Sequence, residues 1–169
     1  RILLRTSCLL LLFATLSTLN AQDTVRVMTY NLLRYGAAGI QCTPTTVSAR
    51  NPWITAILAR AKPDIFGVNE IGPIDNSVAP HVNITQNILP NINYGNYEAT
   101  QIKYESHQDI CNMMWYNADK FGLVKQGLIN VTGTRRDLDF YQFYYKSPGT
   151  ITDSTYLYVV LVHLMASSA

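Results

Sequence analysis

The fold is decided by the stretch from residue 63 to residue 70, which runs Pro63-Asp64-Ile65-Phe66-Gly67-Val68-Asn69-Glu70. Its apolar centre contains β-branched and aromatic side chains and follows a proline, which predicts a buried β-strand. Residues 25–31 and residues 156–163 have a similar composition and end in Asn31 and His163. We therefore expect three buried strands that each deliver a polar side chain to the rim of a sheet, where open α/β sheets bind their ligands.

A helix is predicted between the first two of these strands. Asn51 is a favourable N-cap, Pro52 suits the first helical position, and apolar residues recur at helical spacing as far as Ala61. A strand, a helix and a second strand form a β-α-β unit, in which the two strands are expected to be parallel. Asn31 and Glu70 would then emerge at the same edge of the sheet.

The rest of the chain predicts mainly strands. A short helix is expected over residues 82–89, followed by strands at residues 111–116, 121–126, 138–145 and 156–162. Their spacing and the turn residues between them favour an antiparallel meander. The predicted fold class is therefore α/β with a mixed sheet.

The first residues have the pattern of a secretory signal peptide. Arg1 and Arg5 precede an apolar run, and Ala21 is the expected last residue before cleavage. The apolar run is shorter than the roughly 18–20 residues that span a bilayer, which favours export over a membrane anchor. We expect a leader at residues 1–21 and one domain at residues 22–169.

Net charge and cysteine content indicate how the chain could bind nucleic acid and whether it fits an exported protein. Without Arg1 and Arg5, the 13 basic residues fall to the same number as the 11 acidic residues, so the predicted mature chain is neutral. Net charge alone would therefore not attract nucleic acid, and any such affinity must come from a local site or from metal ions. Cys42 and Cys111 lie outside the leader, and either a disulfide or two thiols fit an exported protein.

Glu70 is the strongest candidate for function. A carboxylate at the end of an apolar strand is costly to desolvate unless a cation or a hydrogen-bond donor meets it. Mg²⁺ and Ca²⁺ prefer oxygen ligands and often bind through one or two carboxylates together with a substrate phosphate. The structural alternative is a glutamate that caps a helix or forms a salt bridge, for example with Arg34.

Each of the other candidate residues has a functional and a structural interpretation. Asn31 could orient a carboxylate and touch a phosphate oxygen, or it could be a turn residue. His163 could act as a general acid or base or donate to a phosphoryl oxygen, or it could be a structural histidine. Arg136, which follows Arg135, could clamp a phosphate or belong to a solvated turn.

The sequence resembles the endonuclease/exonuclease/phosphatase superfamily, whose members include the DNase I-like nucleases. Four segments carry the resemblance, in the order that the family has them. They are residues 28–32 (Met-Thr-Tyr-Asn-Leu), residues 62–70 (Lys-Pro-Asp-Ile-Phe-Gly-Val-Asn-Glu), residues 112–121 with the sequence Tyr-Asn-Ala-Asp-Lys-Phe at their end, and residues 160–164 (Val-Leu-Val-His-Leu).

The resemblance implies a two-sheet α/β sandwich and metal-assisted cleavage of a phosphoester. By position in the motifs, Glu70 would hold Mg²⁺, Mn²⁺ or Ca²⁺, and Asn31 would support the metal and the phosphate. His163 would stabilise the attacked phosphate, and Arg136 would contact it. The segment at residues 112–121 would form a hairpin in this family.

The resemblance also implies a secreted endonuclease that acts on DNA or RNA and is expected to be monomeric. A lipid phosphodiesterase of the sphingomyelinase type is the alternative within enzymes, and a non-catalytic secreted binding module is the alternative of another class. The family's later Asp-x-Asn and Asp-His motifs do not occur in the sequence. We therefore expect residues 22–169 to be an incomplete, N-terminal part of such a domain that is inactive by itself.

Overall fold

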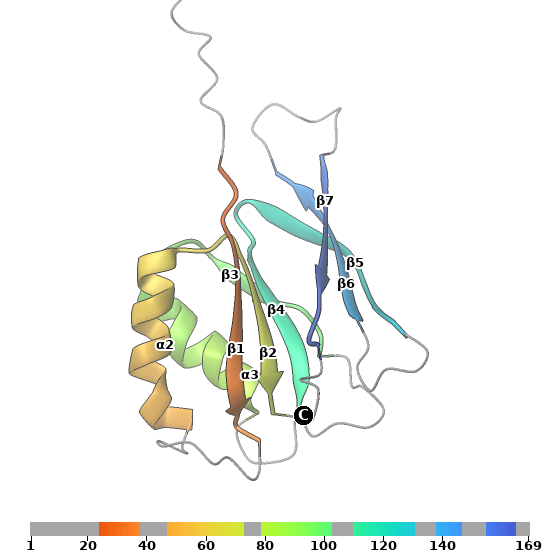
Figure 1. Cartoon of the computed structure of the whole chain (residues 1–169). Coiled ribbons are helices and arrows are strands. Elements are labelled where there is room, and N and C mark those ends of the chain that lie inside the picture. Colours follow the sequence, from red (N-terminus) through yellow and green to blue (C-terminus); the bar gives the residue numbers. More distant parts are fainter. Residues whose placement is uncertain are drawn as a thin grey trace, which may run out of the picture.

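The computed structural model describes residues 24–37, 47–72, 79–102, 110–130, 138–146 and 155–164. The leader, Cys42 and Arg136 lie outside these residues, so the predictions made for them are not examined by the structure. The described residues form two sheets and a helical layer (Figure 1). The elements are β1 (Val27–Tyr35), α2 (Val47–Ala61), β2 (Ile65–Ile71), α3 (Pro80–Asn83), η2 (Ile84–Ile88), η3 (Leu89–Ile92), β3 (Tyr97–Ala99), β4 (Cys111–Asn117), β5 (Phe121–Ile129), β6 (Leu138–Tyr145) and β7 (Tyr156–Leu161).

The first sheet contains the predicted β-α-β unit. Its strand order is β1-β2-β4-β3, and β1 pairs with β2 in parallel, from Val27 opposite Ile65 to Asn31 opposite Asn69. The helix α2 connects these two strands, and with the second helical segment it covers one face of the sheet (Figure 1). The parallel pairing predicted from the sequence is confirmed.

The helix α2 begins at Val47, earlier than the sequence predicted. Asn51 was expected to cap its first turn, but its side chain instead contacts Tyr35 and Asn83 on neighbouring elements. Pro52 lies inside the helix, where it removes one backbone donor. Burial of Ile54 and Leu58 against the sheet stabilises the helix despite this loss.

The short helix predicted at residues 82–89 is part of a longer helical segment. An α-helical turn (α3), a π-helical turn (η2) and a 3₁₀ turn (η3) follow one another directly and end at Asn93, which has a left-handed backbone (φ +51°). Strand β3, which the sequence analysis did not predict, follows and pairs with β4. It is only 3 residues long, too short for a recognisable alternating pattern.

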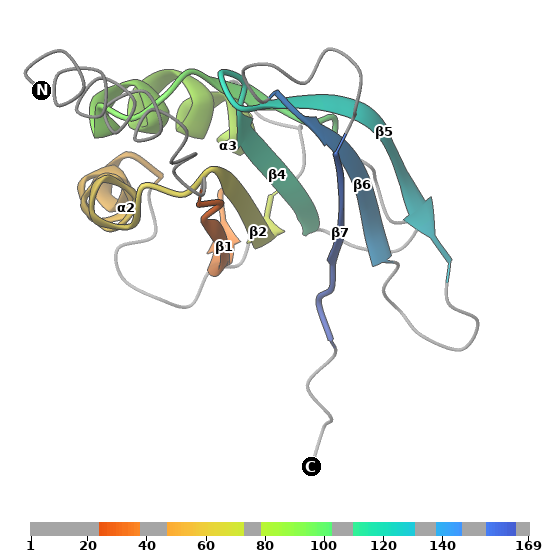
Figure 2. The same ribbon diagram turned by 90° about the horizontal axis from the view of Figure 1, so that it is seen from above.

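The second sheet is the antiparallel meander β5-β6-β7. The sequence predicted a meander that begins with a hairpin of β4 and β5, and this pairing was wrong. The predicted mixed sheet is confirmed, since the first sheet combines the parallel β1–β2 pair with the antiparallel β2–β4 pair. β4 pairs with β2 and β3, so the turn after Asn117 carries the chain from one sheet to the other. Seen from above, the helices, the first sheet and the second sheet form successive layers (Figure 2). The two-sheet α/β architecture is the one that the family resemblance implied.

Two apolar cores hold the layers together. One lies between the helices and the first sheet and includes Leu58, Phe66 and Trp115. The other lies between the sheets and includes Met114, Phe143 and other apolar side chains of the second sheet. No helix in the described ranges is long and apolar enough to cross a membrane.

Burial differs among the three strands that the sequence predicted to be buried. β2 is buried along almost its whole length, as predicted. β1 and β7 instead alternate, and Val27 and Tyr158 are 53% and 59% exposed. Both strands lie at the end of their sheet's strand order, and each has one face on a core and the other toward solvent. The prediction of full burial was therefore wrong for these two strands.

Candidate functional site

Asn31 lies in a bulge of β1. The pairing with β2 is regular as far as Asn31 and resumes at Tyr35, so three residues of β1 lie opposite Glu70 alone. Leu33 and Arg34, within the bulge, have left-handed backbones (φ +48° and +56°). The Asn31 Oδ1 accepts a hydrogen bond from the Leu33 backbone N–H at 2.8 Å, an Asx-type turn that fixes the amide.

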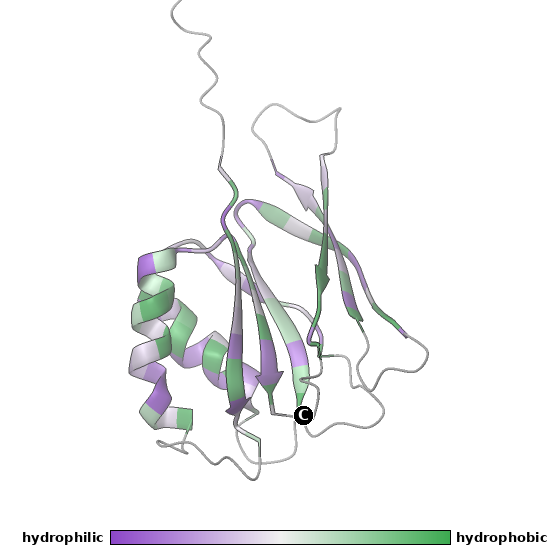
Figure 3. Cartoon of the chain, in the orientation of Figure 1, coloured by the Kyte–Doolittle hydropathy of each residue, from purple (hydrophilic) through white to green (hydrophobic). Residues whose placement is uncertain are grey.

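Glu70 lies in β2 at the same level and also at an irregularity. On its other side, the pairing with β4 shifts between Val68 and Ile71. Its backbone is left-handed (φ +59°), a conformation that costs a residue with a Cβ on the order of 1–2 kcal/mol. Such strain occurs preferentially at functional sites. Figure 3 shows the hydrophilic segments of β1 and β2 side by side at this end of the sheet.

Two donors from different elements meet the carboxylate of Glu70. The Asn31 Nδ2 donates to Glu70 Oε1 at 3.0 Å. The His163 Nε2 lies 3.1 Å from the same oxygen, and the two side chains are 12% and 16% exposed. His163 follows the end of β7 by two residues, so it reaches the site from the second sheet. Asn31, Glu70 and His163 therefore lie together although they come from both sheets.

The sequence analysis placed Asn31 and Glu70 at the ends of their strands. The structure places both inside strands that continue to Tyr35 and Ile71, at bulges that turn the side chains toward one another. Glu70 caps no helix; among the described residues its carboxylate accepts a hydrogen bond from Asn31 and lies at ion-pair distance from His163. The convergence of the three side chains was predicted, whereas the functional roles assigned to them stay predictions.

Further residues that the sequence analysis missed support the site. The Arg50 guanidinium, from α2, donates to the backbone carbonyls of Leu32 and Leu33 and so holds the β1 bulge. Behind Glu70, the Asn69 side chain donates to Asn112 Oδ1 at 2.8 Å. Asn69 and Asn112 could have been noticed in the sequence, because each is a polar residue within an otherwise apolar strand.

The donor set was compared with the requirements of a divalent cation. Among the described residues, no group of three or more His, Cys, Asp and Glu side chains lies close enough together to hold a metal ion. Glu70 Oε1 takes both donors, and Oε2 accepts no hydrogen bond from the described residues. One carboxylate oxygen is thus available, which fits a hard cation that binds through a single carboxylate and completes its shell with water or phosphate.

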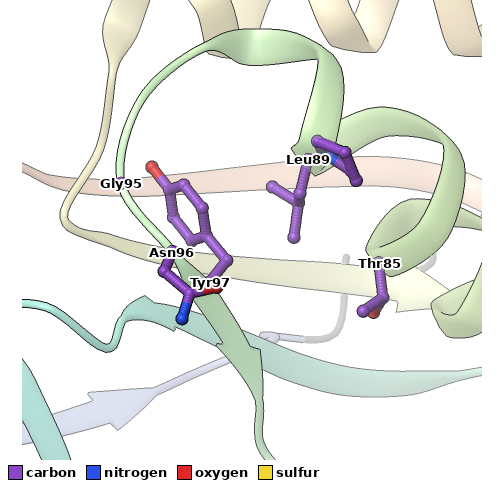
Figure 4. A pocket seen from close by; sticks show the side chains of 6 residues that line it. Thr85, Leu89, Gly95, Asn96 and Tyr97 are labelled. Carbon is purple, nitrogen blue, oxygen red and sulfur yellow. The ribbon is translucent and has the colours of Figure 1, made fainter.

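A small hollow lies elsewhere in the molecule and shares no residue with the site. It has a volume of about 220 Å³ and lies between the helical segment and β3 (Figure 4). Its lining combines apolar side chains with polar groups of residues such as Thr85 and Asn96. This hollow is therefore separate from the candidate site, which is defined by its side chains.

Comparison with known proteins bears on the fold. No protein-family model and no curated protein sequence matches the chain. Several solved structures match. Three of them, with their sequence identity and TM-score, are an endonuclease/exonuclease/phosphatase family protein from Bacteroides thetaiotaomicron (17%, 0.54), D. rerio TDP2 complexed with a single-strand DNA product (13%, 0.51) and a mannosyl-6-phosphatase from B. thetaiotaomicron (15%, 0.50). The matches cover 80%, 82% and 81% of this chain and 49%, 46% and 51% of those chains.

The chain thus spans about half the length of the solved structures that it matches. At this level of identity the likeness concerns the architecture. The parallel β1–β2 pair, the helices on one face of the first sheet and the second, antiparallel sheet all belong to it. The chain has the DNase I-like α/β fold of the endonuclease/exonuclease/phosphatase family.

Proposed function

We propose that this chain is part of a phosphoesterase that works with a divalent cation, Mg²⁺ or Mn²⁺, and cleaves phosphodiesters of nucleic acid. One observation carries the proposal: the Asn31 amide and the His163 imidazole both meet a single oxygen of Glu70, at a strained backbone position. Strain and a shared carboxylate are costly in a purely structural role, and they are typical of a site where geometry matters more than stability.

Each side chain has a definite task in this proposal. The Glu70 carboxylate would hold the cation, and Asn31 fixes this carboxylate by donating to its Oε1. The bound cation neutralises charge that develops on the phosphate. The His163 N–H, now directed at Glu70, donates to a phosphoryl oxygen when the substrate is present. Arg136, outside the described residues, is a further candidate for a phosphate contact.

The fold and two of its matches support the substrate class. D. rerio TDP2 is complexed with single-strand DNA, and the mannosyl-6-phosphatase is named for a sugar phosphate, so this architecture accommodates both kinds of phosphoester. The neutral charge expected for residues 22–169 fits an enzyme that holds nucleic acid through a local, cation-bearing site. Export through residues 1–21 belongs to the same proposal.

Replacement of Glu70 by glutamine in the full-length protein tests the proposal. Glu70→Gln keeps the shape of the side chain and removes its charge, so Mn²⁺ binding, measured by electron paramagnetic resonance, should weaken strongly. Since the cation supplies several kcal/mol and each 1.4 kcal/mol is about tenfold in rate, cleavage of a DNA oligonucleotide should fall about 100-fold or more. Asp119→Asn, at an exposed turn, is the control and should change neither quantity.

The same assay separates the alternatives. Sphingomyelin vesicles and mannose 6-phosphate are offered beside the DNA oligonucleotide, each with Mg²⁺. Preferential cleavage of either one would overturn the nucleic-acid assignment. Unchanged Mn²⁺ affinity in Glu70→Gln would remove Glu70 as the metal ligand, and no hydrolysis of any substrate by the full-length protein would favour a binding module.

A further inference from the structure

A chain of buried polar side chains runs between the two sheets next to the candidate site. The Asn69 Nδ2 donates to Asn112 Oδ1 at 2.8 Å, and the Asn112 Nδ2 donates to Asp139 Oδ2 at 2.8 Å. The three residues come from β2, β4 and β6 and are 9%, 2% and 2% exposed. Burying amides and a carboxylate costs free energy that apolar side chains at these positions would avoid, so their presence calls for a reason beyond stability.

Both ends of this polar chain lie beside residues of the candidate site. Asn69 directly precedes Glu70, and its Nδ2 is also 3.4 Å from the backbone carbonyl oxygen of Val162, which directly precedes His163. At the other end, Asp139 pairs with Leu161, the last residue of β7. The polar chain therefore connects β2 through β4 and β6 to β7, and one of its ends adjoins Glu70 while the other pairs with the residue two positions before His163.

The middle of the chain also supports the bulge at Glu70. The β2–β4 register runs from Val68 opposite Met113 to Ile71 opposite Cys111, so Asn112 alone faces both Asn69 and Glu70. The Asn112 side chain thus binds the strand at the point where the extra residue is accommodated and where Glu70 takes its left-handed backbone. The conformation of Glu70 and the position of Asn112 depend on each other.

We propose that the side chains of Asn69, Asn112 and Asp139 are positioning residues that hold Glu70 and His163 in register across the two sheets. β2 and β7 belong to different sheets, so no strand ladder connects them. Apolar contacts between the sheets are not directional, whereas a row of hydrogen bonds fixes both distance and orientation. The 3.1 Å approach of His163 Nε2 to Glu70 Oε1 is the contact that this registration sets. The inference rests on the proposed function of the same site.

Two variants of the full-length protein test the role of the polar chain. Asn112→Leu removes both hydrogen bonds at the centre of the chain. The exchange Asn112→Asp with Asp139→Asn restores them, because the carboxylate at position 112 accepts from Asn69 and from the amide now at position 139. It also keeps the composition and the charge. Thr100→Val is the matched control, since it likewise removes two buried hydrogen bonds on β4, those of the Thr100 hydroxyl with the Met114 backbone, away from the site.

Metal-dependent DNA cleavage gives the first readout. Groups that orient the ligands of a metal change metal affinity or activity by about 10- to 100-fold when they are removed, so kcat should fall by about that factor in Asn112→Leu with little change in KM. The exchange variant should recover to within about threefold, and Thr100→Val should lose thermal stability without this loss of kcat. Full kcat in folded Asn112→Leu, or no recovery in the exchange variant, would overturn the inference.

Nuclear magnetic resonance gives a second readout that does not depend on activity. The backbone amide resonances of Glu70 and His163 should both shift in Asn112→Leu and return toward their original positions in the exchange variant. This result would stand even if the protein cleaved no phosphoester, which separates failure of the proposed function from failure of the positioning role. Resonances that stay in place in Asn112→Leu would contradict the positioning role.

Discussion

Replacement of Asp64 by asparagine should cost the protein about 2–4 kcal/mol of unfolding free energy. Asp64 directly precedes β2, at the end of the sheet opposite the candidate site, and is fully buried. Its Oδ1 accepts from the Tyr94 hydroxyl at 2.6 Å and lies 3.1 Å from the Lys120 Nζ, and its Oδ2 accepts from the Arg26 backbone N–H at 2.9 Å. One carboxylate thus joins β1, the segment before β3 and the turn between the sheets.

The magnitude follows from what asparagine can replace. Its single oxygen can accept from one side only, so the Arg26 N–H or the Tyr94 hydroxyl is left facing an amide N–H₂, which costs about 1–3 kcal/mol. The ion pair with Lys120 is lost as well. Because the Lys120 side chain is 29% exposed, this pair adds only about 1 kcal/mol. The unsatisfied donor and the lost ion pair together amount to a large share of the roughly 5–15 kcal/mol that stabilises a typical domain.

Asp64→Asn should also change the pH dependence of stability. Burial alone would raise the pKa of Asp64, but the hydrogen bonds from Tyr94, Arg26 and Lys120 lower it overall. A carboxyl whose pKa is lower in the folded state stabilises the protein above its unfolded pKa, near 3.9, and this contribution is lost as the pH falls through the folded value. The unfolding free energy of Asp64→Asn should therefore fall less steeply below about pH 4.

Urea denaturation at pH 7 and at several acidic pH values measures both effects. With a slope of about 2 kcal/mol per molar urea, in the middle of the usual range, the expected loss moves the midpoint by about 1–2 M. Asp119→Asn, an exposed carboxylate that accepts one backbone N–H at 3.0 Å, should cost less than about 1 kcal/mol. A midpoint for Asp64→Asn equal to that of Asp119→Asn would refute the reasoning.

Two other predictions concern packing and alkaline stability. In Gly67→Ala the new Cβ would lie 3.2 Å from Leu161 Cδ1, so the packed Leu161 side chain must shift by a few tenths of an ångström and the unfolding free energy should fall by about 1–2 kcal/mol. Gly127→Ala, with no atom within 4 Å, should cost nothing, and equal melting temperatures of the two variants would contradict this. Burial raises the pKa of Tyr35 to about 12 despite the hydrogen bond from Asn83, so Tyr35 stabilises the protein below pH 10 and loses this effect as the pH rises toward 12. Urea titrations of Tyr35→Phe should show a flatter decline above pH 10 than the parent, and parallel curves would exclude Tyr35 as a source of it.

The sequence predicted the first sheet well because the composition of its strands and the topology of the connecting helix indicate the same arrangement. Pro63 precedes a strand that has no polar side chain from Ile65 to Val68. A helix of sufficient length lies before it, so a parallel crossover connection is expected. That topology alone brings Asn31 and Glu70 to neighbouring strands. The bulges beside them could not be predicted, because a left-handed glutamate opposes local preference and is held by contacts such as Arg50 with the Leu32 carbonyl.

Pairing in the second half was harder to predict for a different physical reason. Alternating or continuous apolar residues indicate that a strand is buried, but they do not say which sheet it joins. The turn residues after Asn117 are compatible with a hairpin, and the structure uses them to pass from β4 in one sheet to β5 in the other. Lys120, within this turn, pairs with the buried Asp64 and so ties the crossing to the first sheet.

The position of the site explains why buried asparagines accompany it. Glu70 belongs to one sheet and His163 follows a strand of the other, so their 3.1 Å contact depends on how the sheets are registered. Leu161 against Gly67 keeps the sheets close, but apolar contacts are not directional and do not fix how one sheet is oriented on the other. The hydrogen bonds from Asn69 and Asn112 would lengthen or break if one sheet moved relative to the other. A site assembled from two sheets therefore requires polar groups inside the sandwich, at positions where stability alone would select leucine or valine.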